Sequence, residues 1–249
     1  MGPTGASPSA LPEPLAGSVA VTTPESALDN PVWASLSGVH AHVAIAHGRA
    51  ARYPPEMSPF AAVSDDKDPD AWGDLAALVG PGALLGFAGL KSLPPPGWDV
   101  VTAVPAVQLL GDDLAPRADP EAVRLGVADV PEMLDLVART QPGPFGQRTI
   151  ELGTYLGIRR GGRLVAMAGE RMRFPGRTEI SAVCTDPAYR GEGLATRLIL
   201  ATALRVHARG DRPFLHVVVS NMDAIRLYET LGFTARREMS FVQMRTPPA

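Results

Sequence analysis

The stretch Arg190-Gly191-Glu192-Gly193-Leu194-Ala195-Thr196 follows a strand-like run, 178–185, and opens a long apolar helix. A glycine-rich turn between a strand and a helix leaves several backbone N–H groups free around one point. The helix dipole adds partial positive charge at the same point. The stretch therefore predicts a binding site for a phosphate-bearing cofactor.

Two other phosphate-binding loops share this context, but their spacing does not fit. A dinucleotide-binding fingerprint needs Gly or Ala five positions after its first glycine, where this chain has Thr196. It also needs an acid at the end of the next strand, and the strand 214–219 ends instead in Ser220 and Asn221. Asp211 lies about twenty residues on, as the fingerprint asks, but at the wrong end of that strand. A P-loop fails as well, because no Gly-Lys-Ser/Thr follows the turn.

A third pattern, Arg/Gln-x-x-Gly-x-Gly/Ala, does fit, with Arg190, Gly193 and Ala195 at its fixed positions. A second block, NMDAIRLYETLGF at 221–233, follows one helix and one strand later. Together the two blocks resemble the GNAT superfamily of acetyl-CoA-dependent N-acetyltransferases, and the resemblance covers residues 121–249. Either block alone is a weak match, so their order and spacing carry the resemblance.

The resemblance implies an α/β fold of the GNAT type over this half of the chain, with a mixed, splayed central sheet flanked by helices. Hydrophobic periodicity and turn residues indicate elements that suit such a fold. The expected strands are 122–126, 154–159, 163–172, 179–185, 214–219 and a final pair near 233–246, and the expected helices are 129–140, 194–208 and 222–231.

The first half of the chain lacks any copy of the glycine loop. Residues 1–27 are rich in Pro, Ala, Ser and Thr, which predicts a disordered tail. Residues 28–110 alternate helix and strand signals and are predicted to form an accessory α/β domain, which could be a degenerate GNAT half. The polar stretch 111–120 is the expected linker to the acetyltransferase domain, 121–249. The expected accessory elements are a helix after Asn30, a helix at 70–79, and strands at 83–88 and 99–110.

Composition excludes several classes of protein. The 249 residues are 45% hydrophobic and 20% charged, which is ordinary for a soluble globular chain. A single cysteine, Cys184, excludes an internal disulfide framework and any multi-cysteine metal site. No run of about 18 apolar residues exists, so we expect no membrane span. The stretch 1–23 lacks the basic start and apolar centre of a signal peptide, and we expect a cytoplasmic protein.

The charge is unevenly distributed along the chain. Residues 1–120 carry 5 basic and 13 acidic side chains, whereas 121–249 carry 18 and 13, within an overall charge of −3. The positive half suits a polyanionic cofactor such as CoA, although solvated surfaces explain the same pattern. No basic cluster is interleaved with aromatic residues, so we expect no nucleic acid partner. His40, His42 and His47 have no carboxylate or cysteine at ligand spacing, so we expect no metal site.

The resemblance also assigns cofactor contacts to three parts of the chain. In the family, backbone N–H groups of the glycine loop hold the CoA pyrophosphate, the strand before it pairs with the pantetheine arm, and the second block contacts that arm. A backbone N–H near Val183 could also polarise the thioester carbonyl. Core packing and helix capping are the alternative explanations of the strand and of the second block. The matching residues are Val183, Cys184, Thr185, Arg190, Gly191, Glu192, Gly193, Leu194, Ala195, Thr196, Asn221, Ala224, Leu227 and Tyr228.

Two residues are the expected catalytic groups. Tyr228 matches the family tyrosine that gives a proton to the departing CoA thiolate. Glu179 lies on the strand before the loop, where some members place a base acting through water, although an exposed edge-strand glutamate explains it equally well. Glu170 is a second candidate base, and His216 fits a core position. Cys184 has no histidine near it in sequence, so we expect no covalent role for it.

The expected function is transfer of an acetyl group from acetyl-CoA to a primary amine by direct attack on the thioester. The acceptor is a small-molecule amine or an amine of a peptide or protein, and monomer and homodimer both stay open. The alternatives are a non-catalytic acyl-CoA-binding or sensing module, and transfer of a different acyl group. Loops 141–150 and 172–178 should border the acceptor site, where Arg148, Arg171 and Arg173 favour an anionic acceptor.

Overall fold

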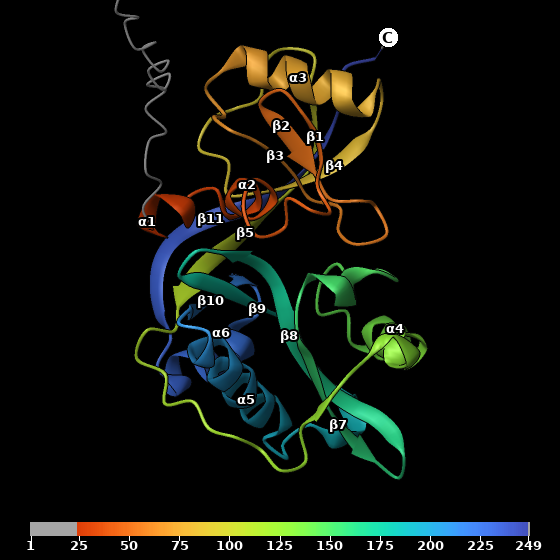
Figure 1. The fold of residues 1–249 in the computed structure, drawn as a ribbon, viewed down its shortest axis with the longest axis vertical. Coiled ribbons are helices and arrows are strands. Elements are labelled where there is room, and N and C mark those ends of the chain that lie inside the picture. Colours follow the sequence, from red (N-terminus) through yellow and green to blue (C-terminus); the bar gives the residue numbers. More distant parts are fainter. Residues whose placement is uncertain (1–23, 249) are drawn as a thin grey trace, which may run out of the picture.

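The computed structural model describes residues 24–248, which form two lobes joined by long strands (Figure 1). Of the predicted tail, 1–27, residues 1–23 lie outside the described part, and Pro24–Ala27 form the short helix α1. The upper lobe in Figure 1 comes from the first half of the chain, and the lower lobe comes mainly from the second half. Among the described residues, no helix has the length and apolar character needed to cross a bilayer.

One eight-stranded mixed sheet runs through both lobes, in the order β4-β11-β5-β10-β9-β8-β7-β6. Its one parallel pair is β9 with β10, and every other neighbouring pair is antiparallel. The predicted α/β class with a mixed central sheet is confirmed. The strands are β4 Leu84–Ala88, β5 Asp99–Leu110, β6 Val123–Arg124, β7 Tyr155–Arg160, β8 Arg163–Phe174, β9 Arg177–Thr185, β10 Arg212–Val218 and β11 Thr234–Arg245.

Strand β5 connects the two halves of the chain. It pairs with β10 on one side, from Phe214↔Leu110 to Val218↔Ala106. On its other side it pairs with β11 along almost its whole length. A strand from the predicted accessory range therefore lies in the middle of the sheet. The division at 111–120 stays a prediction, and that stretch contains neither helix nor strand.

Three helices cover the lower part of the sheet. They are α4 Val130–Thr140, α5 Leu194–Ala208 and α6 Met222–Leu231, and the bounds predicted for the last two are confirmed. Alternate side chains of a strand point to opposite faces, so Tyr155 packs with α4 while Leu156 packs with α5. Helix α6 shares the face of α5, because Tyr228 and Ile199 lie in one buried cluster. Short 3₁₀ turns occur at η1 Val127–Asp129, η2 Thr149–Leu152 and η3 Pro187–Tyr189.

The upper lobe is a small sheet covered by one helix. Its strands β1 Ile45–His47, β2 Ala50–Arg52 and β3 Ala61–Val63 are antiparallel. Helix α3, Pro69–Val79, buries Trp72 against Phe87 of β4. Helix α2, Pro31–Leu36, begins at Asn30 as predicted, because the Asn30 side chain accepts from the Trp33 amide.

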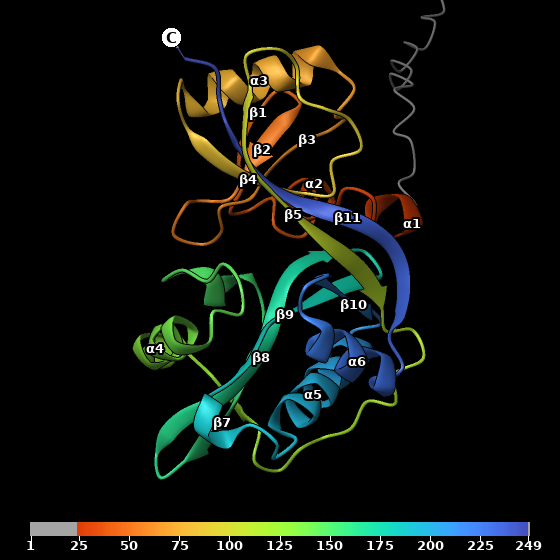
Figure 2. The same cartoon turned by 180° about the vertical axis from the view of Figure 1, so that it is seen from behind.

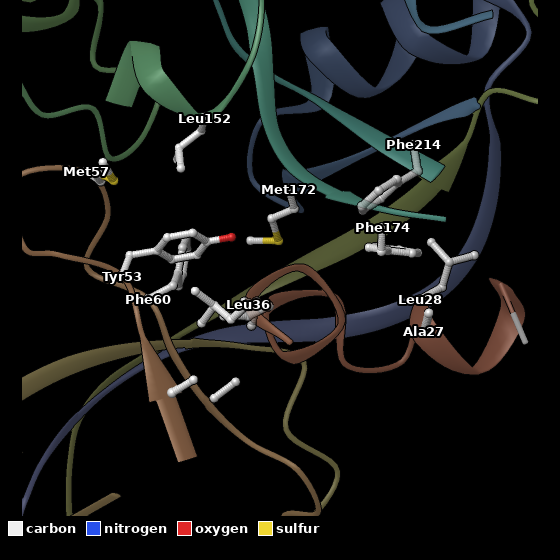
Figure 3. Packing of buried hydrophobic residues seen from close by; sticks show 14 residues of the cluster. Ala27, Leu28, Leu36, Tyr53, Met57, Phe60, Leu152, Met172, Phe174 and Phe214 are labelled. Carbon is white, nitrogen blue, oxygen red and sulfur yellow. The ribbon is translucent and has the colours of Figure 1, made fainter. Parts of the chain in front are cut away.

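A continuous apolar core joins the two lobes (Figure 3). Leu28 and Leu36 from the beginning of the described chain pack with Met172 and Phe174 of β8 and with Phe214 of β10. Each of these five side chains is at most 2% exposed. Because the core is shared, the upper lobe is held firmly against the face of the sheet opposite to α5.

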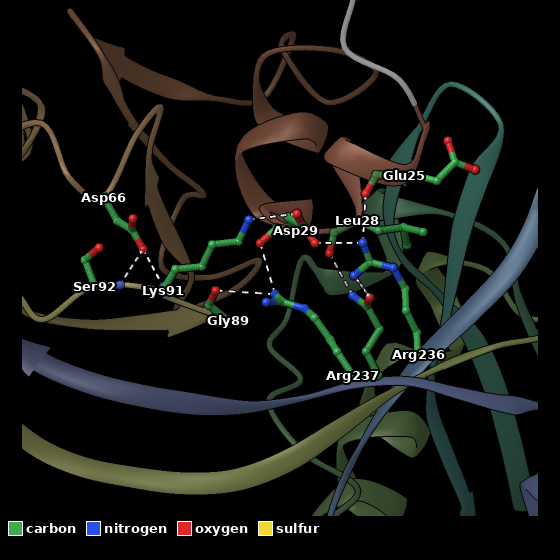
Figure 4. Close-up of polar contacts among 10 residues, drawn as sticks. Glu25, Leu28, Asp29, Asp66, Gly89, Lys91, Ser92, Arg236 and Arg237 are labelled. Atoms are coloured by element: carbon green, nitrogen blue, oxygen red, sulfur yellow. Dashed lines mark hydrogen bonds and ion pairs between the residues drawn. The ribbon is translucent and has the colours of Figure 1, made fainter.

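Polar contacts attach the last strand to the first helices (Figure 4). The Asp29 carboxylate pairs with Lys91 and with Arg236 of β11, both at 2.7 Å. Arg237 donates to the backbone carbonyls of Asp29 and Gly89. Together with β5, these contacts fix the position of the upper lobe above the centre of the sheet.

Candidate functional site

A cleft of about 890 Å³ opens where β9 and β10 separate. The two parallel strands pair from Arg212↔Arg177 to Phe214↔Glu179, and no pairing continues beyond that point. The predicted splay is therefore present. The residues in its walls are Pro59, Phe60, Gly86, Phe87, Thr102, Val104, Thr140, Gln141, Pro142, Gly143, Pro144, Arg171, Ile180, Ser181, Ala182, Val183, Cys184, Thr185, Tyr189, Arg190, Gly191, Gly193, Leu194, Ala195, Thr196, His216, Val217, Val218, Asn221, Ala224, Leu227, Tyr228, Phe241, Val242 and Gln243.

A bulge in β9 shapes the wall on one side of the cleft. The register with β8 shifts between Cys184 and Ser181, so that Ala182 and Val183 together face a single residue of β8. Ala182 has φ of +52°, an uncommon value for a residue other than glycine. A bulge leaves part of a strand's backbone outside the ladder. Backbone groups near Val183 are therefore free to bind a ligand in the cleft.

The glycine loop forms the end of the cleft at the start of α5. Gly191 and Gly193 have φ of +84° and +72°, which favour glycine, and a Cβ on either would meet no atom within 4 Å. Helix α5 begins after Gly193 with no side-chain cap, so its first amides have no partner within the helix. Open space in front of uncapped amides fits a phosphate group. All of the predicted loop residues line the cleft except Glu192.

The opposite wall comes from the N-terminal part of α6. Asn221 caps this helix by accepting from the Ala224 amide at 3.2 Å, so the capping explanation holds for its side chain. Tyr228 is 8% exposed, and burial raises the pKa of its phenol to about 12. Within residues 24–248 its hydroxyl makes no hydrogen bond. Tyr228 therefore presents a protonated, unpartnered phenol to the cleft.

A buried ion pair lies at the point where β9 and β10 part. Arg171 donates to both carboxylate oxygens of Glu179, at 2.8 and 2.6 Å. Burial alone would raise the pKa of Glu179, but Arg171 and a hydrogen bond from His216 outweigh it and lower the pKa to about 2. The Glu179 side chain is 1% exposed and does not line the cleft. The explanation of Glu179 as an exposed edge residue is therefore wrong, and its role as a base stays a prediction.

His216 connects this ion pair to the upper lobe. Its Nδ1 lies 2.8 Å from Glu179, and its Nε2 lies 3.0 Å from the amide nitrogen of Gln108. An amide nitrogen only donates, so His216 accepts at Nε2 and carries its proton on Nδ1. Gln108 also donates to the Leu28 carbonyl and accepts from Arg236. The sequence predicted a core position for His216, and in the structure His216 also lines the cleft.

The second candidate base is placed elsewhere. Glu170 is 3% exposed, pairs with Arg209 at 3.0 Å, and does not line the cleft. Cys184 does line it, and burial raises the pKa of its thiol to about 11, so the thiol is neutral near pH 7. The neighbouring Thr185 hydroxyl is buried without a hydrogen-bond partner. Among the described residues, no group of three or more His, Cys, Asp or Glu side chains could hold a metal ion.

The third wall of the cleft comes from residues that sequence reasoning missed. The upper lobe contributes Phe60 and Phe87, and β11 contributes Phe241. The Arg171 guanidinium lies over the Phe60 ring, 5.1 Å from its centroid. No aspartate or glutamate lines any part of the cleft. No local signal could have found this wall, because it joins residues far apart in the chain.

The predicted borders of the acceptor site are only partly present. Residues 140–144 line the cleft, but no residue of 172–178 does. Arg148 pairs with Glu151, and Arg173 pairs with Asp211. Arg171 is already neutralised by its carboxylate partner. All three arginines are therefore paired with carboxylates, and the expectation that they favour an anionic acceptor stays a prediction.

Comparison with known sequences finds relatives that match part of the chain. A family model described as FR47-like protein matches residues 155–242. The N-alpha-acetyltransferase RimI of Mycobacterium tuberculosis is 35% identical over 132 residues, which is 47% of this chain and 81% of that protein. A mycothiol acetyltransferase of Thermobispora bispora is 46% identical over 57 residues, 22% of this chain and 19% of that one.

Comparison with solved structures extends the similarity to most of the chain. An acetyltransferase of the GNAT family from Novosphingobium aromaticivorans superposes with a TM-score of 0.80 and 43% identity. The match covers 89% of this chain and 99% of that one. It therefore includes the upper lobe as well as the lobe that carries the glycine loop.

Proposed function

The chain belongs to the GNAT superfamily of N-acetyltransferases, and we propose that its cleft binds acetyl-CoA and transfers the acetyl group to a primary amine. Members of this superfamily use acetyl-CoA generally. The main support for the proposal is that three features lie along the same cleft. They are the uncapped start of α5, the bulge in β9 and the separation of β9 from β10.

The cofactor would lie along the cleft from the glycine loop to the ion pair. The amides of 190–196 would hold its pyrophosphate, since the space in front of both glycines is open. The backbone of Val183, Cys184 and Thr185, with Asn221 opposite, would bind the pantetheine arm. Acetyl-CoA supplies the acetyl group as a thioester. A volume of about 890 Å³ leaves room for an acceptor beside it.

Tyr228 is the proposed acid. A phenol with a pKa of about 12 stays protonated at neutral pH, so it always has a hydrogen to donate. A leaving thiolate has a lower basicity, since an ordinary thiol has a pKa of about 8.5. Complete proton transfer from the phenol is therefore uphill. A hydrogen bond from Tyr228 to the developing thiolate supplies most of the stabilisation.

The acceptor amine must lose a proton before it attacks, and the walls favour that loss. A lysine-like amine has a reference pKa of about 10.4 in water. A partly apolar chamber that is lined by no carboxylate disfavours the ammonium form and lowers that pKa. We propose that Glu179 acts indirectly, because its carboxylate holds Arg171 and the Nδ1–H of His216 in place. In this role Glu179 is a positioning residue.

The proposal is tested by binding and turnover in one series. Titration calorimetry with CoA and acetyl-CoA should give a cofactor affinity, and release of free thiol with a panel of amines should give kcat. Tyr228→Phe should leave acetyl-CoA affinity unchanged and lower kcat about 100-fold. Tyr189→Phe is the matched control, because Tyr189 also lines the cleft and should keep its rate.

Each failure in this series has its own meaning. No measurable acetyl-CoA binding would overturn the proposed function altogether. Binding without thiol release for any amine would point to a non-catalytic acyl-CoA-binding module. Turnover that Tyr228→Phe leaves unchanged would remove the acid role and keep the acetyl transfer. Faster turnover of a longer acyl-CoA would replace the acetyl group by another acyl group.

A further inference from the structure

One edge of β5 is unpaired beside the cleft. Strand β10 pairs with β5 only as far as Ala106, and Val219 then donates to the Pro105 carbonyl at 3.0 Å. Before Pro105, no strand of residues 24–248 pairs with β5 on this side. On its other side β5 stays paired with β11 down to Asp99. We name the segment 99–104 the β5 free edge.

The β5 free edge is exposed and apolar. Every residue from 99 to 105 is exposed, although the strand lies inside an eight-stranded sheet. Val100, Val101 and Val104 are 46%, 42% and 41% exposed. Exposed β-branched side chains on a strand with unpaired backbone groups form a template for another strand. Such an edge usually carries charges or a covering loop, and here it has one aspartate at its far end.

The backbone of the β5 free edge offers hydrogen bonds in the outward direction. In an antiparallel ladder the N–H and C=O of one residue point to the same side, and alternate residues point to opposite sides. The Pro105 carbonyl faces β10, so the N–H and C=O of Ala103 face that side as well. Pro105 has no N–H, so it cannot donate a backbone hydrogen bond on this side of β5. Ala103 is therefore the nearest point to the cleft where an added strand can both donate and accept.

The β5 free edge forms part of the rim of the cleft. Thr102 and Val104 are exposed and line the cleft, whereas Phe60 and Phe87 in the same walls are 4% and 1% exposed. In Figure 2, β5 runs beside β11 between the two lobes. An added strand would thus lie along the mouth of the cleft, with alternate side chains toward the interior.

We propose that an extended peptide segment of a protein acceptor adds to the β5 free edge as a strand, and that its N-terminal amine then enters the cleft. This rests on the proposed acetyl transfer. The cleft has no carboxylate to recognise an ammonium, so main-chain hydrogen bonds supply the recognition. A second copy of the chain fits less well, because the edge has six residues and stable interfaces use roughly 20–30 a side.

The test compares two acceptors that share the same reacting amine. The probes are leucinamide and a hexapeptide that begins with leucine, assayed by release of free thiol from acetyl-CoA. In the unaltered protein, kcat/KM should be at least about tenfold higher for the peptide. Ala103→Pro removes the outward N–H and should lower the peptide value about tenfold, with leucinamide within about twofold. Ala103→Ser keeps the N–H and should match the unaltered protein with both probes.

A second measurement uses the unaltered protein, so that the inference can be tested even if Ala103→Pro folds poorly. The same hexapeptide with its amine already acetylated should inhibit leucinamide turnover competitively in the unaltered protein. Absence of inhibition, or equal peptide kinetics in Ala103→Pro and Ala103→Ser, would overturn the inference while acetyl transfer to leucinamide stands. A dimer in light scattering that Ala103→Pro converts to a monomer would assign the edge to a second copy. Absence of acetyl-CoA binding would overturn the proposed function and this inference with it.

Discussion

The upper and lower lobes contain the same succession of elements around two different parallel strand pairs. In the lower lobe, β7, β8 and β9 are antiparallel, α5 follows, and β10 returns parallel to β9. In the upper lobe, β1, β2 and β3 are antiparallel, α3 follows, and β4 returns to form one isolated parallel bridge, between Gly86 and Phe60, the residue before β3. Each lobe then gives its last strand to the other, since β5 pairs with β10 and β11 pairs with β4. This correspondence supports the prediction that 28–110 is a degenerate GNAT half.

The turns that lead into the two helices differ in charge and in capping. The turn before α5 has two glycines and an uncapped helix start. The segment 64–70, which comprises the turn before α3 and the first two residues of that helix, has four aspartates and one lysine. There Asp68 caps the helix by accepting from the Asp70 amide at 3.0 Å, and Asp66 accepts from the Lys91 and Ser92 amides. An anion is therefore attracted to one helix start and repelled from the other.

The strand pairs that flank the two helices differ as well. Strands β9 and β10 part at Glu179 and leave a cleft. In the upper lobe the Gly86 amide donates to the Pro59 carbonyl at 2.9 Å. A Cβ at Gly86 would lie 3.4 Å from the Pro59 carbonyl oxygen, so the two backbones approach closely. The same succession of elements therefore leaves parted strands and a free helix start in the lower lobe alone, and that is where we propose that the cofactor binds.

The largest effect is expected from breaking the ion pair at the point where β9 and β10 separate. Glu179→Gln should lower the free energy of unfolding by about 3–5 kcal/mol, because Arg171 would stay buried without its counter-charge. Glu170→Gln is the matched control, since its partner Arg209 is 28% exposed and screened by water. Urea denaturation of both variants measures the difference. An equal loss of unfolding free energy in the two variants would mean that burial of the Arg171–Glu179 pair does not increase its effect on stability.

The same carboxylate should give the lower lobe a characteristic acid sensitivity. The pKa of Glu179 falls from 4.5 to about 2 on folding, so the folded state favours its ionised form. The resulting stability of about 3 kcal/mol is present above pH 4.5 and is lost as the pH falls toward 2. The free energy of unfolding, measured between pH 6 and pH 3, should fall less steeply in Glu179→Gln than in the unaltered protein. Parallel pH profiles would assign the loss to other carboxylates.

A third change gives the glycine loop the charge of its upper-lobe counterpart. Gly193→Asp should raise the Kd for acetyl-CoA about 100-fold, because the carboxylate would face the pyrophosphate at the start of α5. Gly193→Asn is the matched control, since both residues tolerate the positive φ of +72° and differ in charge alone. Calorimetric titration of both variants separates charge from bulk. If the Asn variant lost as much affinity as the Asp variant, the added side chain would exclude the cofactor by its size.

The elements that the sequence predicted correctly are those with local signals. The bounds of α5 and α6 follow from an apolar stripe that a glycine ends, at Gly210 and Gly232, and the turn before α5 follows from its two glycines. The role of this turn in binding a cofactor stays a prediction. The place of β5 between β10 and β11 depends on pairing across more than 100 positions, which leaves no mark in a short window. The burial of Glu179 was missed because its partners His216 and Arg171 come from the two neighbouring strands, 37 and 8 positions away along the chain.

Removing the aspartate charges of the upper lobe should have the smallest effect: the number of acetyl-CoA molecules bound per chain should not change. The unaltered protein should bind one acetyl-CoA per chain in calorimetric titration. Replacing Asp65, Asp66 and Asp68 by asparagine removes the charge of the turn and keeps the oxygen atoms that accept its hydrogen bonds. The stoichiometry should stay at one, because the bond from Gly86 to Pro59 still closes the strands. A second equivalent bound by this variant would show that charge alone separates the two lobes, and that the strands open readily once a phosphate can approach.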